Sequence, residues 1–255
     1  MYLQHLFGLD GRTALVTGGS SGIGRAITLA LAGAGAHVLV AARTASAIDE
    51  TVAAVRAAGG SADGIVADLS TRAGAHALAD AATEAARAVD VLVSSAGINL
   101  RPAMADLDET VWDATMAVNL EAPFLLGQRL APAMVERGYG RLVHVSSQQA
   151  HRAFAASGAY GVSKAAVEAL ARSQAEAWSP HGVTANVLVP GFVPTPLNRR
   201  LSSDPATVAA LAARTLVGRN GHPDDFAGAA VFLASPASAY VTGQSIAVDG
   251  GLSVH

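Results

Sequence analysis

The sequence predicts a doubly wound α/β fold, a parallel sheet of about seven strands with helices on both faces. Short β-rich runs alternate with Ala-rich stretches of helical length along the whole chain. The runs are nearly continuous in apolar residues, as in strands that are buried on both faces, and each parallel crossover needs a connection of helix length. Because 51% of the 255 residues are hydrophobic and no linker interrupts the pattern, we expect one domain over residues 1–255 with one sizeable core.

The expected strands are residues 13–17, 37–41, 64–67, 91–94, 142–146, 183–189 and 245–248. The stretches between them can place apolar residues on one helical face, which predicts helices at residues 24–34, 47–58, 71–88, 110–137, 159–178 and 223–233. Residues 190–222 are irregular, with four Pro, and follow a strand. This segment is expected over the carboxyl edge of the sheet, either as a substrate lid or as a variable surface excursion.

The composition excludes several classes of function. The chain has no Cys, which rules out a disulfide framework, a cysteine nucleophile and a thiolate metal site. A net charge of −3 argues against nucleic acid as a partner. No apolar run approaches the ~18 residues of a membrane span, and no secretory signal is visible, so we expect a cytoplasmic protein. No metal site is expected, because metal-ligand spacing is absent from His37, His144, His151, His181 and His222.

A glycine-rich turn follows the first expected strand and opens the first expected helix. Gly18 would permit the tight turn, Gly22 would let the backbone approach a pyrophosphate, and Gly24 would let the helix pack closely on the sheet. An anion placed there would meet unpaired N–H groups and the positive end of the helix. A purely structural turn rarely needs three glycines at this spacing. The pattern predicts a dinucleotide site that also includes Ser20, Ser21 and Ile23.

The ends of the second and third strands bear on the choice of coenzyme. The second strand is followed by Arg43, with no acidic residue at its tip. A carboxylate there would accept the ribose hydroxyls of NAD(H), whereas Arg43 would pair with the 2′-phosphate of NADP(H). We therefore expect NADP(H) to be preferred, with NAD(H) as the alternative coenzyme and a solvated arginine as the non-functional interpretation. Asp68 is expected either at the adenine edge or as a helix N-cap.

Three residues form a candidate catalytic group: Ser147, Tyr160 and Lys164. Tyr160 and Lys164 are four residues apart at the start of one helix, which places them on the same face. Lys164 is the only Lys among seventeen basic residues, which indicates that a compact ammonium group is required there. An ammonium ~4 Å from a phenol, whose pKa is ~10 when free, would lower that pKa by about three units. The expected pKa of Tyr160 is therefore near neutrality; an ordinary surface pair is the alternative.

These motifs together resemble the short-chain dehydrogenase/reductase family, and the resemblance covers essentially the whole chain. The matching positions are the glycine turn from Thr17 to Gly24, Ser147, Tyr160 with Lys164, Pro190-Gly191 with Thr195, and Asn119 in the long central helix. The resemblance implies a Rossmann fold and hydride transfer to or from a carbonyl carbon. It also implies a homotetramer built on two long helices, with a homodimer as the alternative.

The resemblance also implies a role for each catalytic residue. Tyr160 would exchange a proton with the carbonyl oxygen, and Ser147 would hydrogen-bond the same oxygen. Lys164 would lower the pKa of the phenol and hold the nicotinamide ribose, while Asn119 would keep a water chain connected to the lysine. Where the family usually has Asn-Asn, this chain has Ser94-Ser95. Serine hydroxyls have shorter reach and fewer donors than asparagine amides, so we expect weaker local hydrogen bonding at the strand end and weaker coenzyme binding. Further expected coenzyme contacts are Leu69, Ala96, Gly97, Pro190, Gly191, Val193 and Thr195.

Several segments are similar to the gluconate 5-dehydrogenase-like group of sugar-acid and polyol enzymes: residues 6–11, 217–219 and 232–235. The amide side chains of Gln148 and Gln149 would suit a hydroxyl-rich small molecule. A carboxylate on that molecule could be bound by arginines: Arg152, Arg199 and Arg200. The alternative is that each of these side chains is simply solvated. One alternative is a reductase similar to 3-oxoacyl-carrier-protein reductases. Another is a non-catalytic NADP(H)-binding sensor, against which the complete Ser-Tyr-Lys set argues.

Overall fold

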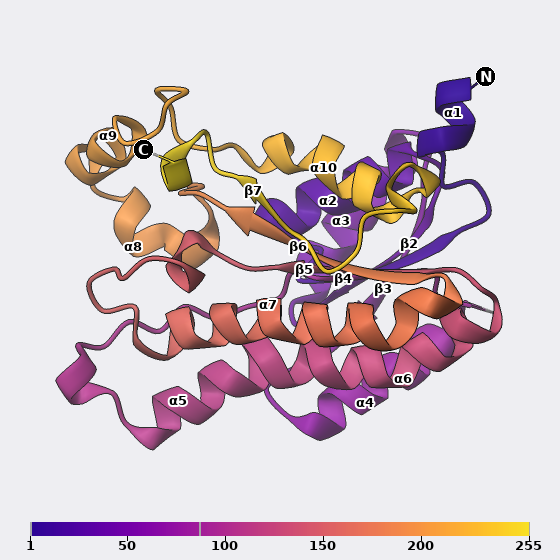
Figure 1. Cartoon of the computed structure of the whole chain (residues 1–255), viewed down its shortest axis with the longest axis horizontal. Helices are drawn as coiled ribbons and strands as arrows, with labels where there is room; N and C mark the ends of the chain where they lie inside the picture. The colour runs from indigo at the N-terminus through magenta and orange to yellow at the C-terminus, as the bar shows by residue number, and fades with distance from the viewer. Residues whose placement is uncertain (1, 87, 255) are drawn as a thin grey trace.

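The computed structural model of the chain describes residues 2–86 and 88–254, and its centre is one parallel sheet (Figure 1). The strand order is β3-β2-β1-β4-β5-β6-β7, and every pair of neighbours is parallel. The doubly wound fold expected from the sequence is therefore confirmed. The strands are β1 (Thr13–Thr17), β2 (His37–Ala42), β3 (Ser61–Val66), β4 (Val91–Ser94), β5 (Gly140–Val145), β6 (Val183–Pro190) and β7 (Ser245–Val248).

Helices cover both faces of the sheet. In the view of Figure 1 the upper layer contains α2 (Gly22–Gly33), α3 (Ala45–Ala57) and α10 (Ala227–Ala234). The lower layer contains α4 (Arg72–Ala85), α5 (Glu109–Met116), α6 (Ala122–Glu136) and α7 (Gly158–Trp178). The short helices α8 (Arg199–Ser202) and α9 (Pro205–Ala212) lie beyond the carboxyl ends of the central strands, and α1 (Tyr2–Phe7) lies near the N-terminus.

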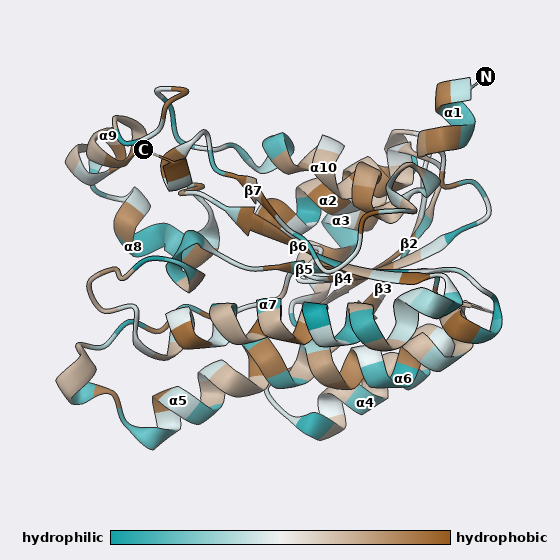
Figure 2. Ribbon diagram, in the orientation of Figure 1, coloured by the Kyte–Doolittle hydropathy of each residue, from teal (hydrophilic) through white to brown (hydrophobic). Residues whose placement is uncertain are grey.

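Alternation of side chains along the strands divides the core into two layers. In β1, Ala14 and Val16 belong to the cluster beneath α2, α3 and α10, whereas Leu15 belongs to the cluster beneath α4 and α6. β4 repeats the pattern, with Val93 in the first cluster and Leu92 in the second. Because both faces are covered, both sets of side chains are apolar, and the strands are largely brown in Figure 2.

The structure also corrects several expected boundaries. The third strand begins at Ser61 and the fifth at Gly140, earlier than expected. The single helix expected at 110–137 is interrupted by a π-helical turn at Ala117–Glu121. Short helices occur within 190–222, where Asp204 caps α9 through its side chain, and α1 was not expected at all. The expected helix 71–88 ends at Ala85, and residue 87 lies outside the described residues. Among the described helices, none has the length and apolarity to cross a membrane.

Phe226 provides a direct test of the upper core. Its side chain is fully buried, and the 3₁₀ turn that carries it packs against α2, the helix that opens at the glycine turn. We predict that Phe226→Ala lowers the free energy of unfolding by about 3–5 kcal/mol, because a large cavity replaces the ring. Tyr2→Ala, at a side chain that is 77% exposed, should change it by less than about 0.5 kcal/mol. Equal effects in urea denaturation would contradict this packing.

Candidate active site

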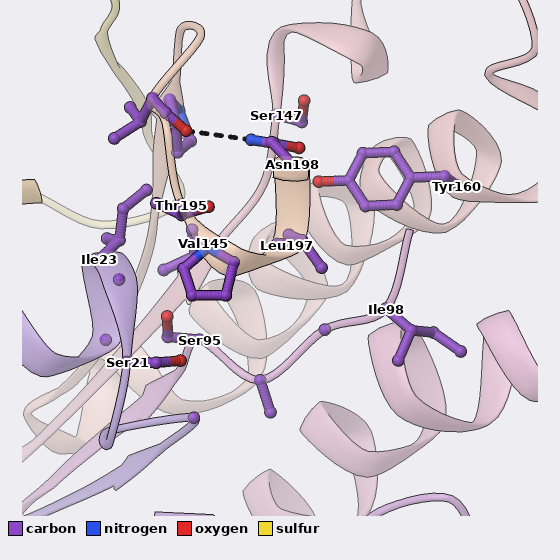
Figure 3. A pocket seen from close by; sticks show the side chains of 18 of the residues that line it. Ser21, Ile23, Ser95, Ile98, Val145, Ser147, Tyr160, Thr195, Leu197 and Asn198 are labelled. Atoms are coloured by element: carbon purple, nitrogen blue, oxygen red, sulfur yellow. Dashed lines mark hydrogen bonds between the residues drawn. The ribbon is translucent and has the colours of Figure 1, made fainter. Parts of the chain in front are cut away.

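A cavity of about 650 Å³ opens at the carboxyl edge of the sheet. There the strand order reverses, since β1 has β2 on one side and β4 on the other, and parallel α/β sheets bind ligands at this position. Figure 3 shows the cavity between the glycine turn and the start of α7. Every residue that the sequence predicted as a coenzyme contact lines it: Gly18, Ser20, Ser21, Gly22, Ile23, Gly24, Arg43, Asp68, Leu69, Ala96, Gly97, Tyr160, Lys164, Pro190, Gly191, Val193 and Thr195.

The glycine turn has the geometry that the spacing predicts. Gly18 has φ +66° and Gly22 has φ +50°, a conformation that residues with a Cβ adopt only with strain. A Cβ on Gly24 would lie 2.2 Å from the carbonyl oxygen of Gly18, so only glycine lets the helix lie this close to the turn. Ser21 is the N-cap of α2, but its side chain makes no cap hydrogen bond. The first N–H groups of α2 therefore lack a side-chain cap and can bind an anion.

Arg43 and Asp68 lie at the β2–β3 end of the cavity. Both line the cavity, and the charge of Arg43 contributes to lowering the pKa of Asp68, although hydrogen bonds from Ser70 contribute more. The Asp68 carboxylate accepts the Ser70 N–H at 3.0 Å. Thr71, not Asp68, is the N-cap of α4, since its hydroxyl accepts the Gly74 N–H. The helix-cap interpretation of Asp68 is therefore wrong.

Thr17 links the ends of β1 and β4 beneath the cavity floor. Its hydroxyl donates to the Val93 carbonyl at 3.3 Å and accepts the N–H groups of Ser95 and Ala96 at 3.2 Å each. This bond set fixes the start of the loop that continues through Gly97. The Ser94 hydroxyl is buried, and the described residues provide no hydrogen-bond partner for it. Thr17 thus supports this loop where the two serines replace the more usual asparagines.

Asn119 lies within the π-helical turn and does not line the cavity. Its side-chain oxygen accepts the Ile98 N–H at 2.9 Å, while its amide donates to the Ile98 carbonyl and to the Ser163 hydroxyl, both at 3.0 Å. The side chain therefore joins the loop after β4 to α7. A Cβ on Gly97 would lie 3.3 Å from the Asn119 oxygen and 3.7 Å from the Lys164 nitrogen, so Asn119 holds this loop directly against the lysine.

Ser147, Tyr160 and Lys164 meet in the cavity, as the sequence predicts. Ser147 follows β5 and caps a 3₁₀ turn, accepting the Gln149 N–H at 3.2 Å. In Figure 3 the Tyr160 hydroxyl points toward Ser147 and Asn198. Tyr160 and Lys164 are both buried on α7. The Lys164 nitrogen donates to the Val145 carbonyl at 2.7 Å and lies 5.6 Å from the centre of the Tyr160 ring.

The expected acidity of Tyr160 is wrong. Burial raises the pKa of Tyr160 to about 12, even though a hydrogen bond with Ser147 and the charge of Arg101 both oppose it. Burial also lowers the pKa of Lys164 to about 8. The expectation gave the effect of an ammonium at ~4 Å before desolvation opposes it, whereas here the effect of burial is larger and the ammonium is directed at the Val145 carbonyl. The Tyr160 phenol therefore keeps its proton at neutral pH.

The predicted substrate residues are only partly brought together. Gln149 lines the cavity and accepts the Ser157 hydroxyl at 2.8 Å, but Arg152 and Arg199 are not among the lining residues. Arg152 instead donates to the Ser253 carbonyl, because the 3₁₀ turn after Ser147 directs it toward the C-terminal segment. Arg200 lines the cavity, as expected. Sequence reasoning missed several other lining residues, among them Arg101, Phe154, Asn198 and Leu252.

These four residues lie on loops or short 3₁₀ turns that meet the site only through the tertiary fold. Arg101 follows β4, Phe154 precedes α7, Asn198 precedes α8, and Leu252 follows β7. The one available sequence signal was the position of Arg101, four residues after Gly97 in the loop that follows the fourth strand. Among the described residues, no cluster of three or more His, Asp or Glu side chains could hold a metal ion.

Comparisons with known proteins agree with this geometry. The family model described as enoyl-(acyl carrier protein) reductase matches residues 18–253. Gluconate 5-dehydrogenase of Gluconobacter oxydans is 36% identical over 252 residues, which are 98% of this chain and 97% of the relative. Galactitol 2-dehydrogenase (L-tagatose-forming) of Cereibacter sphaeroides is 40% identical over 258 residues, which are 100% of both chains.

A solved structure is also similar. It is a gluconate 5-dehydrogenase from Burkholderia cenocepacia in complex with NADP and tartrate, 37% identical, with a TM-score of 0.94 over 99% of both chains. The cavity, the glycine turn and the Ser147–Tyr160–Lys164 group thus occur in a chain whose whole length aligns with dehydrogenases. The protein belongs to the short-chain dehydrogenase/reductase family of oxidoreductases.

Proposed function

We propose that the protein is an NADP(H)-dependent oxidoreductase that interconverts a ketone and a secondary alcohol on a hydroxyl-rich small molecule, a sugar acid or a polyol. The observation that carries the proposal is the buried Tyr160, whose hydroxyl points into the same cavity as Ser147, Lys164 and the glycine turn. Such a group can transfer a proton to or from a carbonyl oxygen that lies beside a dinucleotide.

The residues at the glycine turn fit a dinucleotide phosphate. The N-terminus of α2 has no acidic residue in its first turn and no side-chain cap, so its N–H groups and its dipole favour an anion. A Cβ on Gly22 would lie 3.1 Å from the Thr195 side chain, so glycine keeps the passage between them open. Arg43 would pair with a 2′-phosphate, and Lys164 would hold the ribose next to Tyr160. When bound, the coenzyme supplies or accepts the hydride.

The chain itself supplies the proton chemistry. With its pKa raised to about 12, the phenol of Tyr160 remains protonated at neutral pH and is ready to donate to a carbonyl oxygen in the reductive direction. Ser147 would hydrogen-bond the same oxygen and share the charge that develops on it. Asn119 would act as a positioning residue through Ile98, since it holds the loop that lies against Lys164.

The substrate class is inferred from the relatives and from individual polar side chains that line the cavity. Two of them act on gluconate and on galactitol by name. Gln149 and Asn198 would offer amide groups to substrate hydroxyls near Tyr160. A ketoreductase of 3-oxoacyl-carrier-protein substrates is the second candidate, because a Pseudomonas aeruginosa relative named rhamnolipids biosynthesis 3-oxoacyl-[acyl-carrier-protein] reductase is 37% identical over 250 residues. Comparing turnover of 5-keto sugar acids and 3-oxoacyl thioesters with NADPH distinguishes the two.

The proposal extends to the assembly and the location. A single domain over residues 1–255, with residues 190–222 as the substrate segment, would form a homotetramer, or else a homodimer, through the long helices of the lower layer. Partly exposed large apolar side chains on α5, α6 and α7 support this contact: Trp112, Phe124 and Val162. Light scattering in solution measures the molar mass of the assembly and so distinguishes a homotetramer from a homodimer. A cytoplasmic location is proposed because metabolism there supplies the coenzyme.

Removing one hydroxyl tests the catalytic assignment. We predict that Tyr160→Phe lowers kcat by about 10²- to 10⁴-fold, because the proton donor is lost while the ring still fills its space. Binding of NADPH, followed by fluorescence, should remain within a factor of about three of the wild type. Tyr240→Phe, at a fully exposed tyrosine, is the matched control and should leave kcat unchanged. Wild-type turnover by Tyr160→Phe would refute the oxidoreductase mechanism and favour a binding protein.

Coenzyme preference is tested at Arg43. We predict that the wild type has a higher kcat/KM with NADPH than with NADH, and that Arg43→Ala lowers the value for NADPH by about 10- to 100-fold, because a charge-assisted pair with the phosphate is lost. The value for NADH should change little. Arg25→Gln removes an arginine of α2 that does not line the cavity, and it should preserve the preference. A wild type that prefers NADH would contradict the assignment.

A further inference from the structure

Residues 249–254, the C-terminal segment, follow β7 and bring one side chain into the cavity. They end in a 3₁₀ turn, Leu252–Val254. Leu252 lines the cavity and is 4% exposed, whereas Val254, in the same turn, is 79% exposed. The turn thus directs its leucine inward and its valine outward, and none of the catalytic roles assigned above uses the leucine.

The turn that follows the catalytic serine holds the C-terminal segment in place. The Gln148 amide donates to the Asp249 carboxylate at 2.8 Å, and the Arg152 guanidinium donates to the Ser253 carbonyl. These two bonded residues enclose Leu252 in the chain, so the leucine is tied on both sides to the turn beside the serine. Leu252 therefore lies at the catalytic end of the cavity, not at the end formed by β2 and β3.

Hydrogen bonds within the C-terminal segment fix its shape. The Asp249 carboxylate accepts the N–H of Gly251 at 2.9 Å and the N–H of Ser253 at 2.8 Å. Gly250 has φ +63° and Gly251 has φ +83°, so the chain turns sharply just before the leucine. A Cβ on Gly191 would lie 2.9 Å from the Asp249 Cα, which shows how closely the segment packs on the end of β6. The leucine is therefore carried by a backbone that is bonded at each step.

The C-terminal segment also contacts the substrate segment, residues 190–222. The Val217 N–H donates to the Gly250 carbonyl at 3.1 Å. A Cβ on Gly251 would lie 2.8 Å from the Leu216 side chain. Figure 1 shows the C-terminal turn next to α9. The segment therefore fills the space between the turn after the catalytic serine and the residues that lie over the carboxyl edge.

We infer that Leu252 is a specificity-determining residue that limits the length of the substrate on one side of the reacting carbon. An apolar side chain offers no hydrogen bond, so it selects by excluding volume and by leaving a hydroxyl that faces it without a partner. A carbon chain that extends past Leu252 would have to displace a side chain anchored on both sides. This inference rests on the proposed function and narrows it to substrates with a short carbon chain beyond the reacting carbon.

The test uses polyols that differ only in length. NADP⁺-dependent oxidation is measured for D-threitol, xylitol, galactitol and the seven-carbon perseitol. Leu252→Ala should raise the ratio of kcat/KM for the longest active polyol to that for the shortest by about 10-fold, since one misfitting methylene group changes kcat/KM by roughly 10- to 200-fold. Leu252→Phe should lower the same ratio by about 10-fold. Loss of folded protein would scale both values alike and leave the ratio unchanged.

Val254→Ala is the matched control, because it shortens an apolar side chain of the same turn that faces away from the cavity. It should leave the ratio within about twofold of the wild type. The melting temperature of each variant is measured alongside, so that a change in stability is recorded separately from a change in selectivity.

The possible outcomes separate the two proposals. An active enzyme whose ratio is the same in the wild type, Leu252→Ala and Leu252→Phe overturns the role of Leu252 and leaves the oxidoreductase proposal standing. A change in Val254→Ala as large as that in Leu252→Ala overturns it as well. If only 3-oxoacyl thioesters are turned over, the sugar-acid and polyol assignment is wrong, and the same ratio is measured between long and short acyl chains. A wild type that oxidises no secondary alcohol and reduces no ketone with either coenzyme overturns the proposed function itself.

Discussion

Burial of Tyr160 and Lys164 on α7 is the constraint on which the site depends. Both side chains are buried on one face of α7, and burial shifts their pKa values in opposite directions, upward for the phenol and downward for the ammonium. A pair exposed to solvent would keep ordinary pKa values, with that of the phenol near ~10. Here the phenol keeps its proton firmly, and the lysine directs its ammonium at the Val145 carbonyl instead of the hydroxyl. A positively charged ligand ring placed beside Tyr160 would favour the ionised phenol, so the reactivity of the site depends on what binds there.

The parallel sheet positions this buried pair next to an anion site. Reversal of the strand order between β1 and β4 opens the cavity, and the glycine turn after β1 brings the N-terminus of α2 to one wall of it. Thr17 fixes the loop after β4 through its contacts with Ser95 and Ala96, and Asn119 continues that support through Ile98 to α7. The π-helical turn at Asn119 interrupts the long helix at this position, as π-bulges often do at functional sites. One connected set of hydrogen bonds therefore runs from the phosphate end of the cavity to the catalytic helix.

Much of this arrangement could be predicted from the sequence because its determinants are local. Each of these determinants depends on a short stretch of chain. They are the apolar strands that alternate with helices, the glycines of the turn (Gly18, Gly22 and Gly24), and the four-residue spacing of Tyr160 and Lys164. The sequence-based predictions were wrong or incomplete where tertiary packing determines the pKa or the position of a side chain. The pKa of Tyr160 depends on burial, which no local pattern reports, and Arg152 turns to the C-terminal segment because of the 3₁₀ turn before it. Arg101 was missed because the cavity acquires it only when the loop after β4 folds against residues near Ala155. Helices α8 and α9 were missed because four prolines suggested an irregular segment, although Pro205 occupies the first turn of α9, where proline is tolerated.

The ionisation of Tyr160 is the most direct test of the account. Carbon-13 labelling of the tyrosine rings, with Tyr160→Phe to assign the signal, reports whether each phenol is protonated at pH 10, where an unperturbed tyrosine with a pKa of ~10 is half ionised. Because burial raises the pKa of Tyr160 to about 12, the account predicts that Tyr160 is still protonated at pH 10 in the ligand-free protein, while the exposed Tyr2 and Tyr240 are partly ionised. Binding of NADP⁺ should move the Tyr160 transition to lower pH. A Tyr160 that is already ionised at pH 10 without ligand, or that does not respond to NADP⁺, would contradict the account.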